Sequence, residues 1–260
     1  MPVNASPASV RSPSDTDVGV RLFVFHHAGG SHFLYREWPG LFPAGWDVRL
    51  LDAPGHGRLM GQPPYVDAAA LADHFLAAID SELDVPYALF GHSMGGLIAY
   101  ELALRLSGAG RTPPVWLGMS GRGAPGHGSR RRVPRHLLAD EDLRRELAAL
   151  GGTPAEVLDH PGMWQMFEPV IRADLRLVET WRPDLSAAPR TAVSVFGGIS
   201  DPSVPHEHLA AWAGRTEHFI GMHLFEGGHF YFLPDPRDLI SRITGDIRIA
   251  RHLSGPARPF

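Results

Sequence analysis

The serine at position 93 stands in a pattern that could make it a nucleophile. It lies in the segment GHSMG at 91–95, after an apolar run at 87–90 and before an apolar helical pattern at 96–103. A strand, a sharp turn at a serine and a helix form a nucleophile elbow, which raises the serine oxygen above the end of the sheet. The glycines fit this turn, because a side chain there would clash with the backbone. The alternative is a plain Gly-Ser turn between a strand and a helix.

A serine nucleophile needs a base and an orienting acid, which in hydrolases with such an elbow follow it in the order acid, then histidine. Asp201 comes just after the predicted strand 191–196, in GGISDP, and His229 comes just after the predicted strand 219–225, in GGHF. Asp184 competes for the role of acid, but it precedes a strand and would lie at the opposite edge of the sheet. We therefore predict Asp201 as the acid and His229 as the base.

Acyl transfer also requires donors that stabilise a negatively charged oxygen. The backbone N–H that follows the nucleophile, that of Met94, is one candidate, and the loop after an early strand supplies the other. In the segment HHAGGS at 26–31 we predict the N–H of Ala28, because small residues let the backbone approach a substrate carbonyl. Each such donor contributes roughly 3 kcal/mol to transition-state stabilisation in serine hydrolases. The alternative is a glycine-rich turn without a donor role.

The chain has 15 histidines, so position relative to the strands has to decide which of them do chemistry. His92 precedes the serine, and the elbow would direct its side chain into the core. His206 and His208 stand two residues apart at a predicted helix start, which is the wrong spacing for one helical face; we predict both to be solvated. Of His26 and His27, which end the first strand, one is expected to pack beneath the active site.

Strands alternate with helices along the chain, which predicts an α/β fold with a mostly parallel sheet covered on both faces. The predicted strands are 20–25, 46–51, 87–90, 115–119, 191–196 and 219–225. A helix is predicted over 68–83, with Leu71, Phe75, Ile79 and Leu83 along one face. One domain would span 18–253, between a disordered N-terminal extension at 1–17 and a C-terminal tail at 254–260.

The stretch 121–185 interrupts the alternation with helical segments at 140–150, 154–158 and 163–181. An insertion between two core strands of an elbow hydrolase would form a lid above the active site. The alternative is a set of helices that merely covers one face. Four apolar side chains of the insertion could line an acyl channel or be plain core: Met163, Trp164, Met166 and Phe167.

Composition excludes several other chemistries. The chain has no cysteine and no lysine, which removes disulfides, thiolate zinc sites, a cysteine nucleophile, a P-loop lysine and a Schiff-base lysine. A net charge of −4 without a basic stripe argues against nucleic acid as a partner. No apolar run reaches the length of a membrane span. The first residues lack the apolar core of a signal peptide, so we expect a cytoplasmic protein.

Taken jointly, these segments resemble the type II thioesterases associated with polyketide and nonribosomal peptide synthetases, which have the α/β-hydrolase fold. The resemblance spans about 21–239 and rests on FHHAGGS at 25–31, PGHGR at 54–58, GHSMGG at 91–96, LGGTP at 150–154, IRAD at 171–174 and GGHF at 227–230. The chain departs from the family pattern at two positions. His26 stands where proline is common, and His56 stands where arginine is often found.

The resemblance implies an enzyme that hydrolyses acyl thioesters held on the phosphopantetheine arm of an acyl or peptidyl carrier protein. Ser93 would attack the carbonyl, His229 and Asp201 would move and orient the proton, and Ala28 and Met94 would form the oxyanion hole. Such an enzyme clears aberrant short acyl chains or releases stalled intermediates, and it needs no metal or redox cofactor. We expect a monomer.

Two other functions remain open on the sequence alone. A general carboxylesterase or lipase would use the same residues on oxygen esters, and a non-catalytic carrier-protein-binding module would keep them without using them. The run Arg130-Arg131-Arg132 could meet an acidic carrier protein, or it could be a solvated charge run.

Overall fold

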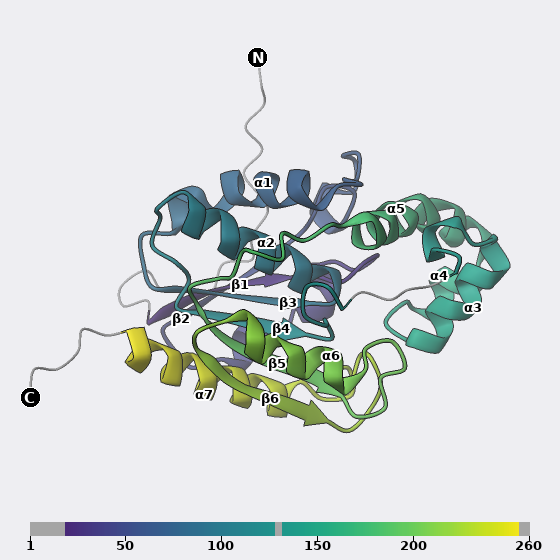
Figure 1. Ribbon diagram of the computed structural model, residues 1–260. Coiled ribbons are helices and arrows are strands. Elements are labelled where there is room, and N and C mark those ends of the chain that lie inside the picture. The colour runs from purple at the N-terminus through teal and green to yellow at the C-terminus, as the bar shows by residue number, and fades with distance from the viewer. Residues whose placement is uncertain (1–18, 128–131, 255–260) are drawn as a thin grey trace, which may run out of the picture.

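The protein is built around one parallel sheet with helices on both faces (Figure 1). The computed structural model describes residues 19–127 and 132–254. The strands lie in the order β2-β1-β3-β4-β5-β6, and every neighbouring pair is parallel. Their bounds are β1 Val20–Phe25, β2 Trp46–Leu51, β3 Tyr87–His92, β4 Trp116–Ser120, β5 Ala192–Gly198 and β6 Phe219–Phe225. The predicted α/β class and parallel sheet are confirmed.

The central strands consist mostly of apolar residues because helices cover both of their faces. Successive side chains of β1 enter the two cores alternately: Phe23 and Phe25 pack on one face of the sheet, Leu22 and Val24 on the other. Every residue of β1, β3, β4 and β5 is buried, whereas the edge strand β6 is half-buried along its whole length. The sheet thus offers a rigid frame whose strand ends can carry polar side chains.

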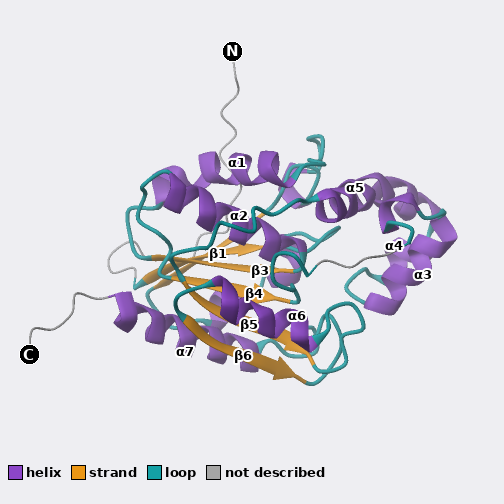
Figure 2. Cartoon of the chain, in the orientation of Figure 1, coloured by secondary structure: helices purple, strands orange, loops and turns teal. Residues whose placement is uncertain are grey.

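Helices α1 and α2 cover one face of the sheet and α7 covers the other (Figure 2). Their bounds are α1 Ala68–Ile79, α2 Met94–Gly108, α6 His206–Ala210 and α7 Arg237–Ser254. The α1 helix begins after Asp67, whose side chain accepts a hydrogen bond from the N–H of Ala70 at 2.9 Å. It ends at Ile79, four residues earlier than predicted, and continues as the 3₁₀ turn Asp80–Glu82. None of the described helices is long and apolar enough to cross a membrane.

A group of helices between β4 and β5 lies beyond the end of the sheet, at the right in Figure 1. It contains the 3₁₀ turn η5 Arg135–Leu137 and the helices α3 Asp140–Leu150, α4 Ala155–Asp159 and α5 Pro161–Thr180. We call this group, 135–180, the lid. It has a hydrophobic cluster of its own, formed by Leu143, Leu147, Leu158, Trp164, Ile171 and Leu175. The lid therefore folds around a small core separate from the two that flank the sheet.

The predictions for the chain ends and for part of the lid loop fall outside the described residues. The extension at 1–17 and residues 255–260 belong to this group, as do Arg130 and Arg131 of the arginine run. Ser254, the first residue of the predicted tail, is the last residue of α7.

Candidate active site

Ser93 occupies the turn between β3 and α2. Its backbone has φ 54° and ψ −109°, and it is the one described residue other than glycine with a positive φ. This conformation costs an L-residue on the order of 1–3 kcal/mol and persists only where the surroundings enforce it. Its N–H is fixed by a 2.8 Å hydrogen bond to the carbonyl of Ser120 at the end of β4. The serine is thus held at the carboxyl end of the sheet.

Two glycines allow the sharp turn at Ser93. A Cβ atom on Gly91 would lie 2.1 Å from the carbonyl of Gly95, one turn further along the chain. A Cβ atom on Gly95 would lie 2.1 Å from the carbonyl oxygen of Phe25 in β1. Neither clash involves a flexible side chain that could move away. The spacing of the GxSxG pattern therefore follows from backbone contacts on both sides of the serine.

The predicted acid and base are in contact. His229 Nδ1 lies 2.7 Å from Asp201 Oδ2, and both side chains are almost fully buried. The other carboxylate oxygen, Oδ1, accepts hydrogen bonds from the N–H and the hydroxyl of Ser203, at 2.7 and 2.6 Å. Burial by itself raises the pKa of Asp201, but the hydrogen bonds from His229 and Ser203 outweigh it, and the pKa lies below its usual value. A carboxylate at Nδ1 leaves Nε2 of His229 as the proton acceptor.

The loops that carry Asp201 and His229 cross at close range. A Cβ atom on Gly198, the last residue of β5, would lie 2.0 Å from the carbonyl oxygen of Gly228. Next to this contact, the N–H of Ser200 donates to the carbonyl of Gly227 at 2.9 Å. The glycines before each residue thus let the two loops touch, which places the carboxylate beside the imidazole.

A cavity of about 590 Å³ lies between the sheet and the lid, and Ser93, His229 and Ala28 line it together. The apolar residues that line it from α3, α5 and the position after α5 are Leu147, Leu150, Leu175, Val178 and Trp181. The lid also contributes the polar residues Arg135, Thr153 and Glu179 to the lining. A pocket of this size and polarity is typical of small-molecule sites. The structure therefore brings the three predicted residues to one chamber and roofs it with the lid.

The two predicted oxyanion donors are available. Met94 is the first residue of α2, where backbone N–H groups have no partner within the helix. Among the described residues, neither the N–H of Met94 nor that of Ala28 meets a hydrogen-bond acceptor. The side chain of Met94 is buried in the core, so only its backbone is relevant here.

Two neutral histidines pack around His229. The ring of His92 lies 4.7 Å from that of His229, and His27 lies 6.2 Å from His92. Burial, together with the neighbouring imidazoles, lowers the pKa of both His27 and His92 well below the usual value. His92 Nδ1 is 2.9 Å from the hydroxyl of Ser120, which in turn contacts Tyr231. The expected packing role of His92 is confirmed, and these two rings surround His229 without adding charge.

The structure corrects one prediction and bears on two alternatives. His208 is not fully solvated: it lines the cavity, and its ring lies 5.2 Å from that of His127. Met163, Trp164, Met166 and Phe167 were open between an acyl channel and plain core, and none of them lines the cavity; Trp164 is buried in the lid core, Phe167 packs against that core, and Met166 is exposed. The lining residues of α5 come instead from its C-terminal half. Asp184 lies apart from the site and bonds to Ser186.

No motif in the sequence predicted that Arg122 would line the cavity. Its guanidinium lies 5.0 Å over the ring of Trp181, a distance suited to a cation–π contact. A second contact fixes Trp181: its Nε1 donates a hydrogen bond to Glu101 Oε1 at 2.7 Å. Burial lowers the pKa of Arg122 to about 10, and the side chain remains cationic at neutral pH.

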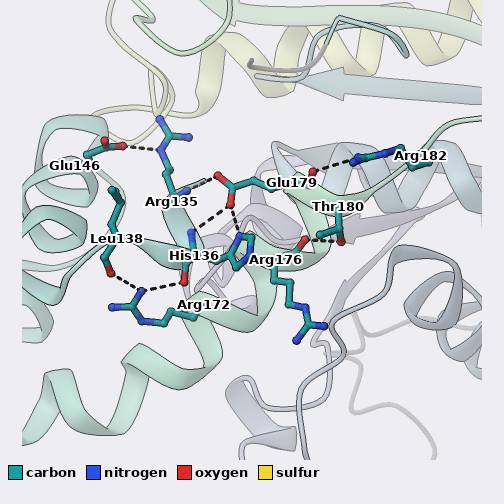
Figure 3. A network of polar contacts seen from close by, with 9 residues as sticks. All are labelled: Arg135, His136, Leu138, Glu146, Arg172, Arg176, Glu179, Thr180 and Arg182. Carbon is teal, nitrogen blue, oxygen red and sulfur yellow. Dashed lines mark hydrogen bonds and ion pairs between the residues drawn. The ribbon is translucent and has the colours of Figure 1, made fainter. Parts of the chain in front are cut away.

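A polar network fixes the start of the lid against α5 (Figure 3). Glu179 accepts the N–H of Arg135 at 2.7 Å and contacts Nδ1 of His136 at 2.6 Å. Arg172, about two turns earlier on the same face of α5, donates to the carbonyls of His136 and Leu138 at 3.0 and 2.8 Å. The η5 turn is thereby tied to the helix that roofs the cavity.

Comparison with known proteins agrees with this geometry. A model of the thioesterase domain matches residues 20–247. The type II thioesterase BorB of the borrelidin biosynthetic cluster is 31% identical with a TM-score of 0.83, over 92% of this chain and 97% of BorB. RedJ, a thioesterase of the prodiginine pathway of Streptomyces coelicolor, is 30% identical with a TM-score of 0.81, over 93% and 92% of the two chains.

One relative has a name that describes a dehydrogenase and not a thioesterase. The linear gramicidin dehydrogenase LgrE of Brevibacillus parabrevis is 31% identical over 91% of each chain. The family model and both solved structures describe thioesterases, and they cover most of the chain. The chain therefore belongs to the thioesterase family and has the α/β-hydrolase fold.

Proposed function

We propose that this thioesterase hydrolyses acyl groups from the phosphopantetheine arm of a carrier protein, with Ser93 as the nucleophile. The observation that carries the proposal is the chamber that Ser93 and His229 line together, with Asp201 at 2.7 Å from the imidazole. Its relatives BorB and RedJ belong to biosynthetic clusters, which supports carrier-bound acyl chains as the substrate class.

In the proposed mechanism, His229 Nε2 takes the proton of Ser93 as the serine oxygen attacks the thioester carbonyl. Asp201 stabilises the imidazolium that forms and keeps the ring in the orientation set by its 2.7 Å contact. The N–H groups of Met94 and Ala28 donate to the oxyanion of the tetrahedral intermediate. The C–S bond then breaks, and His229 returns its proton to the leaving thiol.

The second half of the cycle releases the acyl group. His229 takes a proton from water, which attacks the acyl-serine ester and forms a second tetrahedral intermediate at the same oxyanion site. Collapse of this intermediate returns the proton to Ser93 and frees the carboxylic acid. The apolar residues that α3 and α5 contribute to the chamber suit a short acyl chain, and we propose that the enzyme clears aberrant short chains from stalled synthases.

The test is hydrolysis of acyl-carrier-protein substrates of increasing chain length by the wild-type protein and by Ser93→Ala. Loss of the nucleophile should lower kcat on the order of 10⁴-fold or more. Ser241, an exposed serine on α7, offers the matched control, and Ser241→Ala should keep full activity. Intact-mass measurement of the wild-type protein should detect an acyl adduct that Ser93→Ala lacks.

Matched oxygen esters and an active-site serine probe separate the other functions. Faster turnover of oxygen esters than of thioesters would favour a general carboxylesterase. A protein that binds the carrier but neither turns over any ester nor reacts with a fluorophosphonate would be a non-catalytic module. Activity that survives Ser93→Ala would refute the mechanism.

A further inference from the structure

One buried carboxylate joins the lid to the loop that carries the proposed oxyanion donor. Asp174 lies on α5, and its side chain is only 2% exposed. Its Oδ2 accepts a 2.7 Å hydrogen bond from the N–H of Gly29, the residue after Ala28. The same oxygen lies 2.8 Å from Nε2 of His56. One carboxylate oxygen of the lid helix therefore bonds to both the oxyanion loop and His56.

The loop at 27–30 is a tight turn, and helix α5 contacts it at Gly29. The N–H of Gly30 donates to the carbonyl of His27 at 3.0 Å, and Gly29 has φ +73°, as the third residue of a type II turn requires. A Cβ atom on Gly29 would lie 2.8 Å from Ile171, one turn before Asp174 on α5. Helix α5 thus fixes the peptide next to Ala28 by both packing and a hydrogen bond.

His56 has the hydrogen-bond pattern of an imidazolium. Its Nδ1 lies 3.0 Å from the carbonyl of Pro54, and its Nε2 lies 2.8 Å from Asp174. Both partners are acceptors, so both ring nitrogens must carry a proton. Burial alone would lower the pKa of His56, but the carboxylate of Asp174 outweighs it and raises the pKa above the usual value.

The other titratable groups around His56 do not replace this cation. His26 packs against it with ring centroids 4.6 Å apart. His26 Nε2 accepts the N–H of Ala53, and burial followed by the nearby His56 lowers its pKa to about 4, so it is neutral. Asp52 is the second carboxylate near His26, and its oxygens form hydrogen bonds with the ring and the backbone N–H of His32. Asp174 therefore depends on His56 for its counter-charge.

We propose that Asp174 and His56 are positioning residues: Asp174 orients the Ala28–Gly29 peptide for the oxyanion, and the imidazolium of His56 holds Asp174 in place. The inference rests on the proposed function of Ala28. When His56 loses its proton, one of its two hydrogen bonds loses its donor, and a buried carboxylate is left without a partner charge, which is unfavourable. Because the folded state raises the pKa of His56, the arrangement is complete at lower pH and fails as pH rises through that value.

The test compares His56→Gln and His56→Arg with the wild-type protein, using kcat and KM for an acyl-pantetheine thioester from mildly acidic to alkaline pH. The wild type should lose kcat on the alkaline side. His56→Gln should lower kcat on the order of 10- to 100-fold with little change in KM, since an oxyanion donor acts in the transition state. His56→Arg keeps a permanent cation, and it should restore kcat and remove the alkaline loss.

A second histidine–aspartate pair, in which the aspartate is buried and the histidine half-buried, provides the control for a merely structural effect. His223 Nε2 lies 2.9 Å from Asp246, between β6 and α7, and neither residue lines the cavity. His223→Gln should lower the melting temperature but leave the pH profile of kcat unchanged. Equal loss of kcat in His56→Gln and His223→Gln, or an alkaline loss that persists in His56→Arg, would overturn the inference. A wild-type protein without thioesterase activity would instead contradict the proposed function.

Discussion

Asp201 is held by His229 on one oxygen and by two groups of Ser203 on the other. This arrangement keeps the carboxylate ionised and the imidazole in one tautomer. We predict that Asp201→Asn lowers kcat by about 10⁴-fold, because an amide at this place favours the wrong tautomer of the base. Steady-state hydrolysis of an acyl-pantetheine thioester measures the effect. Asp184→Asn is the matched control, since Asp184 is exposed and bonds only locally.

The lowered pKa of Asp201 also predicts how the free energy of unfolding depends on pH. The pKa of Asp201 is lowered in the folded protein, so its ionised form contributes stability above the ordinary pKa of aspartate, about 4. That contribution disappears as pH falls through the lowered value. The difference in free energy of unfolding between wild type and Asp201→Asn should therefore narrow in acid, as urea titrations at several pH values would show. A difference that widens in acid would contradict the assigned direction.

At the level of elements, two of the three glycines in helix α2, Gly95 and Gly108, have opposite surroundings. A Cβ atom on Gly95 would meet the backbone of β1 at 2.1 Å, whereas around Gly108 there is open space. We predict that Gly95→Ala destabilises the protein by about 3 kcal/mol or more, since a backbone clash forces the helix off the sheet. Gly108→Ala should be neutral or stabilising by about 0.5–1 kcal/mol, because alanine favours the helix. Chemical denaturation of both variants measures this, and equal effects would contradict the close packing.

For the whole molecule, the arginine run near the lid predicts a docking effect for carrier proteins. Of the run, the structure describes Arg132, which is exposed. Charge reversal by Arg132→Glu should lower kcat/KM for carrier-bound substrates by up to about tenfold, since charges at the rim of an interface act chiefly on association. Free acyl-pantetheine should react as before. Arg242→Glu, on α7, is the control, and equal loss for both substrates would refute docking.

The sequence predicts those parts of the site that depend on short segments of the chain, and not those that depend on how distant elements pack together. Ser93, Asp201 and His229 each follow an apolar strand, and ends of parallel strands meet at one edge, so their meeting at that edge could be expected. The pairing of His56 with Asp174 could not, because it joins residues 118 positions apart through the docking of α5. Which residues of α5 line the cavity could not be predicted for the same reason. An amphipathic pattern predicts a helix and its buried face, but which turns lie above the cavity is set by how the lid sits on the sheet.

The strand order has a consequence for the growing chain. From β1 onward the sheet adds β3, β4, β5 and β6 at a single edge in the order of their synthesis. A nascent protein can therefore extend its sheet strand by strand as it leaves the ribosome, without inserting a late strand between early ones. His229 follows the last of these strands, so the proposed base joins Ser93 only after β6 has been made. A truncated chain that ends before β6 would carry the serine but have no means to activate it.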